Sequence, residues 1–322
     1  MPFKNIKGQD AVVKALKGIV EQGRAVGSYL FSGPDGVGKR TTAIELAKAV
    51  NCTEEPGAGQ CDCPVCGKID SGNHPDVFVI FPEGPLGSIK IGKIRDIIYE
   101  ASLKPYEGRK RFFIINDAEA MTEEAQNALL KLLEEPPRNH ILILTSSNPS
   151  GLLPTVLSRC KALKFYNLRR EDILLLLKAR GMEDKEADFL AHMAMGSPAR
   201  AIAFKERDMA SLRDSLVNDF FLRKSALLKE NCLTENAGGH KKEGLYLLLC
   251  WYRDLLVSKF DQEDSEMFNI DRSREIASYA QRFTKDKLAK DLAVIMNTIG
   301  YINRNVNPKI AFFNMAVELK RS

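Results

Sequence analysis

Residues 33–42, GPDGVGKRTT, differ at one position from the phosphate-binding loop pattern GxxxxGK followed by Ser or Thr. Gly33, Gly38 and Lys39 occupy the positions that this pattern requires. Arg40 stands where a hydroxyl group would bind Mg²⁺, and a guanidinium has no lone pair to offer a metal. We therefore expect a loop that can hold ATP or ADP but in which Mg²⁺ binding is doubtful.

The surroundings of this loop favour phosphate binding over a chance glycine-rich turn. The loop follows the apolar run Tyr29–Ser32 and opens the helical pattern Lys39–Val50. Glycines let the backbone wrap phosphates, and the helix N-terminus presents unpaired N–H groups to them. Thr41 can still touch a phosphate. The candidate nucleotide-binding residues of this segment are Gly33, Gly36, Gly38, Lys39, Arg40 and Thr41.

A second acidic element is expected at the end of another strand, and RFFIINDAEA at 111–120 fits that expectation. An ordinary strand of this kind ends in Asp-Glu, which hold the metal and polarise the attacking water. Here the pair is Asn116 and Asp117, and Glu119 is expected to belong to the following loop. Arg40 and the Asn116–Asp117 pair thus both depart from the usual residues at metal-binding positions. Together they predict a site that does not hydrolyse ATP.

Four of the seven cysteines lie within fifteen residues: Cys52, Cys61, Cys63 and Cys66. Their spacing predicts a structural Zn²⁺ site, because four sulfur ligands leave no open position for catalysis. Unligated surface cysteines are the alternative. Of the isolated cysteines, Cys232 and Cys250 are predicted to be buried apolar thiols.

Length and composition place the chain among soluble globular proteins. At 322 residues and 44% hydrophobic it can form two or three domains with their own cores. It shows neither an export signal nor a membrane-spanning run, so a cytoplasmic protein is expected. The net charge of +5 permits an anionic partner without requiring one.

Strand and helix patterns alternate in the first half of the chain, which predicts a doubly wound α/β domain with a parallel sheet. The strand-like runs are Tyr29–Ser32, Val77–Phe81, Arg111–Ile115, Ile141–Thr145 and Ala162–Phe165. The helical patterns are Asp10–Gln22, Lys39–Val50, Ile91–Ser102 and Thr122–Glu135. Thr122 is expected to cap the last helix, whose apolar face is Ala125, Leu129, Leu132 and Leu133.

After about Tyr166 the sequence reads as helix throughout, for example at Glu171–Arg180, Glu186–Met195 and Gly244–Phe260, and Asn236–Lys242 is expected to be a loop. We expect three domains. They are an α/β domain at 1–166 with the cysteine knuckle at 52–66, a small helical domain at 167–206, and an all-helical domain at 207–322.

Six short segments together resemble the bacterial DNA polymerase III clamp-loader subunits of the AAA+ class. They are IKGQ at 6–9, GPDGVGKR at 33–40, the four-cysteine cluster, NHPD at 73–76, NALLKLLEEPP at 127–137 and LLPTVLSRC at 152–160. The resemblance covers nearly all of the first 205 residues. With its length, Arg40 and Asn116, the chain is more similar to the delta prime subunits than to the gamma/tau motor subunits.

The resemblance assigns roles to several residues. Ser158, Arg159 and Cys160 match the family's SRC motif, in which the arginine acts as a finger on the nucleotide of a neighbouring protomer. Ser147 falls where a polar sensor of the γ-phosphate would lie. Arg200 falls one position away from the place where the family has a second sensor arginine.

The resemblance also implies partners. Family members have a small helical lid domain and form hetero-oligomers of five subunits, joined by a C-terminal helical collar, that load a sliding clamp on primed DNA. They belong to a DNA-directed DNA polymerase (nucleotidyltransferase) holoenzyme, and a delta prime-like member would have weak or no ATPase activity of its own. The start of 91–102, with Lys90 and Lys93, is the best candidate for a DNA phosphate contact, and solvated lysines are the alternative.

Three hypotheses stay open at this stage. The chain is a rigid AAA+ subunit that supplies Arg159 to a neighbour, a gamma/tau-like ATPase that tolerates Arg40, or a zinc-stapled nucleic-acid-binding module that uses no nucleotide. ATP turnover by the purified chain separates the first two. Strong DNA binding by the isolated chain would favour the third.

Overall fold

The computed structural model describes residues 3–54, 61, 63–84, 87–218, 241–260, 267–303 and 306–321. The chain forms two compact units. The first comprises Met1–Leu176 and Gly196–Ala199, and the second comprises Leu177–Met195 and Arg200–Ser322.

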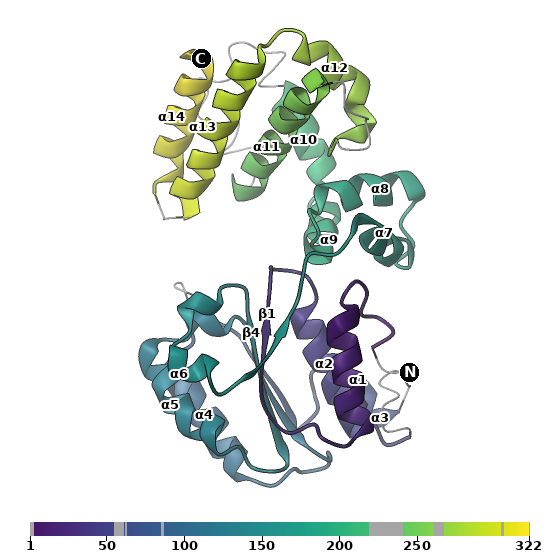
Figure 1. Cartoon of the computed structure of the whole chain (residues 1–322), viewed down its shortest axis with the longest axis vertical. Coiled ribbons are helices and arrows are strands. Elements are labelled where there is room, and N and C mark those ends of the chain that lie inside the picture. The colour runs from purple at the N-terminus through teal and green to yellow at the C-terminus, as the bar shows by residue number, and fades with distance from the viewer. Residues whose placement is uncertain are drawn as a thin grey trace. The chain divides into compact units, whose positions relative to one another are not determined.

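The first unit is built on a five-stranded sheet in which every pairing is parallel (Figure 1). The strands are β1 (Gly27–Ser32), β2 (Val77–Ile80), β3 (Arg111–Ile115), β4 (His140–Ser146) and β5 (Lys161–Lys164), in the order β2-β3-β4-β1-β5. Each connection crosses over, which requires helices between the strands. The predicted doubly wound parallel sheet is confirmed.

This order brings the segments after three strands to one edge of the sheet. Parallel neighbours end on the same side, and β1 pairs with β4, which pairs with β3. The backbone N–H of Gly33, just after β1, donates to the carbonyl of Ser146 at the end of β4 (3.1 Å). The N–H of Asn116, just after β3, donates to the carbonyl of Ile80 at the end of β2 (2.9 Å). Ligands of open α/β sheets bind at such an edge.

Helices cover both faces of the sheet (Figure 1). On one side lie α1 (Asp10–Glu21), α2 (Lys39–Asn51) and the short α3 (Pro64–Asp70), and on the other lie α4 (Ile91–Ser102), α5 (Glu123–Glu134) and α6 (Pro154–Leu157). The unit also contains two short 3₁₀ helices, η1 (Ala118–Ala120) and η2 (Pro149–Gly151), and the start of α7 (Arg170–Lys178).

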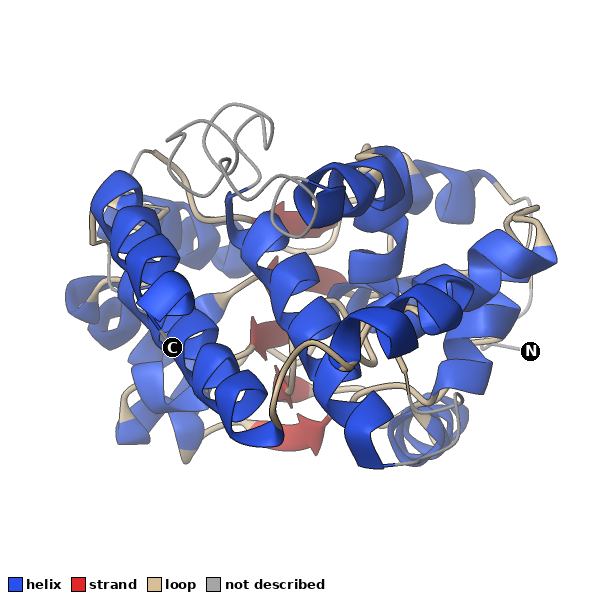
Figure 2. Cartoon of the chain, turned by 90° about the horizontal axis from the view of Figure 1, so that it is seen from above, coloured by secondary structure: helices blue, strands red, loops and turns tan. Residues whose placement is uncertain are grey.

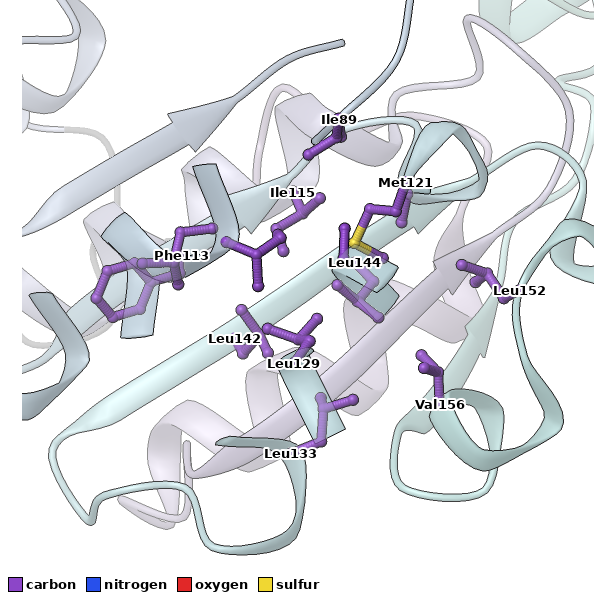
Figure 3. Close-up of a cluster of buried hydrophobic side chains, with 14 of the residues drawn as sticks. Ile89, Phe113, Ile115, Met121, Leu129, Leu133, Leu142, Leu144, Leu152 and Val156 are labelled. Carbon is purple, nitrogen blue, oxygen red and sulfur yellow. The ribbon is translucent and has the colours of Figure 1, made fainter. Parts of the chain in front are cut away.

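The core beneath α4 and α5 is made by alternate strand residues (Figure 3). Phe113 and Ile115 of β3 and Leu142 and Leu144 of β4 point to the same face, because side chains alternate along a strand. They pack with Leu129, Leu133 and Met121, and all are less than 5% exposed. Burying each of these side chains stabilises the fold by roughly 1.5–3 kcal/mol. The strand ends are therefore held by a rigid scaffold.

Helix α5 begins and ends within one residue of its predicted bounds. The Thr122 hydroxyl accepts a hydrogen bond from the N–H of Ala125 (3.3 Å), which satisfies one of the unpaired donors of the first turn. Ala125, Leu129 and Leu133 are buried as expected, whereas Leu132 is only half-buried.

The second unit contains only helices among its described residues, and all described strands lie in the single sheet of the first (Figure 2). Its helices are α8 (Asp184–Met193), α9 (Pro198–Glu206), whose first residues lie in the first unit, α10 (Met209–Val217), α11 (Lys241–Val257), η5 (Ser258–Phe260), η7 (Ile270–Arg272), α12 (Ser273–Ala280), α13 (Lys285–Asn303) and α14 (Pro308–Arg321). The loop predicted at 236–242 is wrong at its end, because Lys241 and Lys242 open α11. Residues 236–240 and Cys232 lie outside the described residues.

A buried arginine ties α10 to the segment before α12. Arg213 is buried, and its two terminal nitrogens donate to the two carboxylate oxygens of Asp271, each at 2.8 Å. Its guanidinium also lies 4.6 Å from the centroid of the Phe189 ring. Such a bidentate pair fixes geometry as well as charge.

In the described part of the chain, the helices are too short or too polar to span a bilayer.

Candidate nucleotide-binding and metal-binding sites

The glycines of the loop between β1 and α2 have backbone conformations that other residues rarely adopt. Gly33, Gly36 and Gly38 have φ angles of +149°, +73° and +100°. A Cβ atom on Gly33 would collide with the carbonyl oxygen of Phe165, and one on Gly36 would collide with the Ser197 hydroxyl. The chain can follow this path only with glycine at these positions.

The side chain of Lys39 folds back onto this loop. It is 6% exposed, and its ammonium group donates to the carbonyl oxygens of Gly33 and Pro34 at 2.5 and 2.7 Å. Burial lowers the pKa of Lys39, and the carboxylates of Asp35, Asp117 and Glu119 oppose that change. The ammonium therefore lies within the loop in a field of negative charge.

The first turn of α2 offers no free hydroxyl on its buried side. The Thr42 hydroxyl donates to the carbonyl of Gly38 (2.9 Å), and its side chain is fully buried. Arg40 and Thr41 are exposed. The Arg40 guanidinium lies 5.4 Å from the centroid of the Phe81 ring, a cation–π contact with the residue that follows β2.

Asn116 and Asp117 hydrogen-bond to each other at the end of β3. The Asn116 amide donates to a carboxylate oxygen of Asp117 (2.7 Å), and its oxygen accepts from the Thr145 hydroxyl of β4 (3.1 Å). Asp117 has a left-handed backbone (φ +50°), and its N–H donates to the same Thr145 hydroxyl (3.2 Å). Burial raises the pKa of Asp117, and Glu119 and Asp35 raise it further. Sequence reasoning missed Thr145 as a partner, although it is a polar residue at the end of an apolar strand.

Glu119 lies in η1 and connects the segments that follow β3 and β4. One of its oxygens accepts from the N–H and hydroxyl of Ser147 (2.8 and 2.7 Å) and from the N–H of Asn148 (3.0 Å). Burial opposes its ionisation, but these donors outweigh burial and lower its pKa. Ser147 itself is exposed at the same edge of the sheet as the phosphate loop.

Arg159 lies at the surface after α6 and is 33% exposed. Its Nε donates to a carboxylate oxygen of Glu134 (2.9 Å), and a terminal nitrogen forms an ion pair with the same oxygen. The other terminal nitrogen donates to the carbonyl of Thr155 (2.9 Å). Ser158 is exposed, and its hydroxyl donates to the same carbonyl (3.2 Å). Within the described residues, no hydrogen bond joins Arg159 to the phosphate loop. Sequence reasoning missed Glu134, which lies in the quoted LLEEPP segment.

Two further candidate residues have partners within the chain. The Arg200 guanidinium lies 5.0 Å from the centroid of the Tyr246 ring. The Lys93 ammonium, near the start of α4, forms an ion pair with Glu83 (3.0 Å). Neither contact identifies a ligand.

The four clustered cysteines converge, with their sulfur atoms all within 4.8 Å of one another. The sulfur of Cys52 lies 3.3 Å from that of Cys61 and 4.0 Å from that of Cys63, and the sulfurs of Cys61 and Cys66 are 3.6 Å apart. Sulfurs at about 2.3 Å from a tetrahedral Zn²⁺ are separated by similar distances. Among the described residues, no other group of His, Cys, Asp or Glu could hold a metal in this way. The donor set therefore fits a structural Zn²⁺.

Two family models match most of the chain. The model described as DNA polymerase III, delta subunit, matches residues 8–169, and a second model, for the C-terminal part of that delta subunit, matches residues 208–321. The delta' subunit of DNA polymerase III from Bacillus subtilis is 31% identical over 315 residues, which are 93% of this chain and 92% of that protein. The chain belongs to the DNA polymerase III delta prime family.

Further relatives are matched over different shares of their length. The delta' subunit of Pseudomonas aeruginosa is 32% identical over 278 residues, 84% of this chain and 83% of that protein. The tau subunit of Escherichia coli is 32% identical over 216 residues, but this match covers only 33% of tau. A solved gamma-subunit-related protein of Thermotoga maritima aligns with 96% of this chain and 99% of its own at 24% identity, with a TM-score of 0.48. The delta prime relatives are thus matched over most of their length, and the tau relative is not.

Proposed function

We propose that this chain is a delta prime-type subunit of a DNA polymerase III clamp loader, and that it does not turn over ATP at its own site. The observation that carries this proposal is the state of the residues that would hold Mg²⁺. Arg40 replaces the hydroxyl, and Asn116 and Asp117 bond to each other and to Thr145. Family membership supports the assembly, and this geometry supports the lack of hydrolysis.

Arg159 acts in trans on the nucleotide of a neighbouring protomer. Its guanidinium lies at the surface, and its ion pair with Glu134 is half-exposed. Exposed pairs of this kind contribute only about 0.2–1 kcal/mol. A phosphate held by the neighbour can therefore replace the Glu134 carboxylate, since a planar guanidinium can bind two phosphate oxygens at once, whereas Arg159 contacts a single oxygen of Glu134. Ser158 precedes the finger, and Ser147 is the sensor candidate.

The proposed partners follow from this assignment. We infer an α/β AAA+ domain at 1–166 stapled by Zn²⁺ in the knuckle at 52–66, a lid at 167–206 and a collar at 207–322 that joins a hetero-oligomer of five subunits. Through that complex the chain would act on a sliding clamp and primed DNA. ATP or ADP would lie against Gly33, Gly36, Gly38, Lys39, Arg40 and Thr41.

A gamma/tau-like motor is the second candidate, because a tau relative matches 65% of the chain and Lys39 and Thr41 are retained. ATP hydrolysis by the purified chain with Mg²⁺ distinguishes the two functions. We expect turnover at background, unchanged in Lys39→Ala and in Lys14→Ala, an exposed control. Clear hydrolysis that Lys39→Ala abolishes and Lys14→Ala preserves would favour the motor and overturn the proposal.

A further inference from the structure

Arg40 reaches from the phosphate loop toward the ends of neighbouring strands. It is the second residue of α2, and Phe81, under its guanidinium, follows β2 at the edge of the sheet. Asn116 lies beside the end of β2, since its N–H donates to the carbonyl of Ile80. Burial raises the pKa of Asp117, and the charge of Arg40 opposes that rise. The guanidinium therefore places a fixed positive charge beside Phe81, at the edge of the sheet where the phosphate loop lies.

Several oxygen atoms that a divalent cation could use already take part in hydrogen bonds within the chain. One carboxylate oxygen of Asp117 accepts from the Asn116 amide, and the Asn116 oxygen accepts from Thr145. The buried hydroxyl of Thr42 donates to the carbonyl of Gly38. Mg²⁺ requires octahedral oxygen ligands, and it would meet repulsion from a guanidinium on the same side. These residues do not fit Mg²⁺.

We propose that this site binds a nucleoside di- or triphosphate without Mg²⁺, and that the guanidinium of Arg40 supplies the positive charge in place of the metal. The inference rests on the proposed nucleotide binding and deepens it. A guanidinium presents five donors in a plane that matches phosphate oxygens, and it is charged at every physiological pH. The N-terminus of α2 adds backbone N–H donors to the same phosphates.

Phe81 orients this guanidinium. The contact with the ring is at the protein surface, where a cation–π interaction is weak enough to be exchanged for a phosphate. Phe81 is 44% exposed, so its ring is available at the surface for this contact with Arg40. The ring thus favours the side-chain direction that points toward the end of β2.

Calorimetric titration of the purified full chain with ADP, in excess EDTA and in excess Mg²⁺, tests this inference. We expect ADP to bind in EDTA and excess Mg²⁺ not to tighten that binding, because no metal takes part at the site and Mg²⁺ complexes ADP in solution. Arg40→Thr restores the hydroxyl of the ordinary loop. In EDTA it should weaken ADP binding by roughly tenfold to a hundredfold, as expected for loss of a charge-assisted hydrogen bond, and Mg²⁺ should recover part of that loss.

Matched variants make the result specific. Arg95→Thr makes the same substitution at an exposed position of α4 and should bind ADP like the wild type. Arg40→Lys keeps the charge and should lose less affinity than Arg40→Thr in EDTA, so it serves if Arg40→Thr does not fold.

Three outcomes would overturn the inference: no ADP binding by the wild type, wild-type binding that requires Mg²⁺, or Arg40 variants that bind as tightly as the wild type in EDTA. None of these bears on whether Arg159 serves a neighbour, which is read out in the assembled complex. Failure of the two proposals is thus distinguishable.

Discussion

Asp76, the last residue of the NHPD segment, shows how one buried carboxylate can organise a loop. It is fully buried, and it accepts hydrogen bonds from the backbone N–H groups of Tyr106, Glu107 and Gly108 and from the Nε of Arg111, each with a 2.8 Å contact. Burial opposes its ionisation, but these donors outweigh burial and lower its pKa. The carboxylate therefore holds the segment between α4 and β3 in place.

Asp76→Asn should reduce the free energy of unfolding by roughly 3–5 kcal/mol at pH 7, because it removes the fully buried one of the two carboxylates, Asp76 and Glu100, that pair with the buried Arg111. Denaturant unfolding followed by circular dichroism measures this loss. Asp96→Asn, on the exposed side of α4, is the control and should change stability by less than about 0.5 kcal/mol. Equal stability of the two variants would contradict the role assigned to Asp76.

The stabilisation by Asp76 should also depend on pH. A carboxyl whose folded pKa is depressed stabilises the fold above its unfolded pKa of about 3.9 and loses that effect as the pH falls through the folded value. The stability difference between the wild type and Asp76→Asn should therefore be constant above about pH 5 and shrink below about pH 4. A difference that grows on acidification would show that the sign is wrong.

At the residue scale, the sequence predicts which residue types stand at the strand ends but not how they pair. Asn116 is recognisable from the sequence as an amide in place of a carboxylate. Its hydrogen bonds with Asp117 and Thr145 are not, and the bond with Thr145 forms only because β3 and β4 lie side by side. The same is true of Glu134, whose bond to Arg159 joins α5 to the segment after α6. Such contacts follow from tertiary packing, which a local sequence pattern does not predict.

At the element scale, hydrophobic periodicity predicted the five strands within two residues of their observed ends. Helix α4 was predicted at its observed bounds, because its apolar residues recur with the helical period. Helix α3 was missed, since Pro64–Asp70 is too short for a periodic pattern. It begins at Pro64, and the preceding Cys63 caps it by accepting from the N–H of Cys66 (3.4 Å).

The cysteine cluster joins α2 to α3. Cys52 ends α2, Cys63 and Cys66 flank the start of α3, and the buried Lys48 of α2 pairs with Asp70 of α3 (2.9 Å) and with Glu45 (2.6 Å). A metal held by these thiols would therefore fix one helix against the other. This is the physical reason to expect that the knuckle depends on its metal.

Cys63→Ser should abolish binding of one equivalent of Zn²⁺ and lower the melting temperature by about 5–10 °C, the shift expected for a loss of a few kcal/mol in a unit of this size. Metal analysis of the purified protein and a thermal melt provide both readouts. Cys160→Ser is the control, because Cys160 packs against the core away from the cluster. Retention of one zinc by Cys63→Ser, or its absence from the wild type, would contradict the proposed site.

At the scale of the whole molecule, the order of the strands explains why most candidate nucleotide-binding residues lie at one edge of the sheet. Arg159 is bonded to other residues. The order β3-β4-β1 brings Asn116, Ser147 and the phosphate loop to one edge. The described hydrogen bonds of Arg159 go to Glu134, Thr155 and Ser158 instead. The sequence predicted this finger only through resemblance, because its proposed target belongs to another chain.

The most direct test is the ATPase rate of the assembled loader, stimulated by the clamp and primed DNA, with Arg159→Ala in this chain. We expect the complex to form, and turnover at the one neighbouring site to fall by roughly 10³-fold while other sites continue. Glu134→Ala, which frees the guanidinium, should retain the wild-type rate. A fully assembled Arg159→Ala complex that hydrolyses ATP like the wild type at every site would contradict the account.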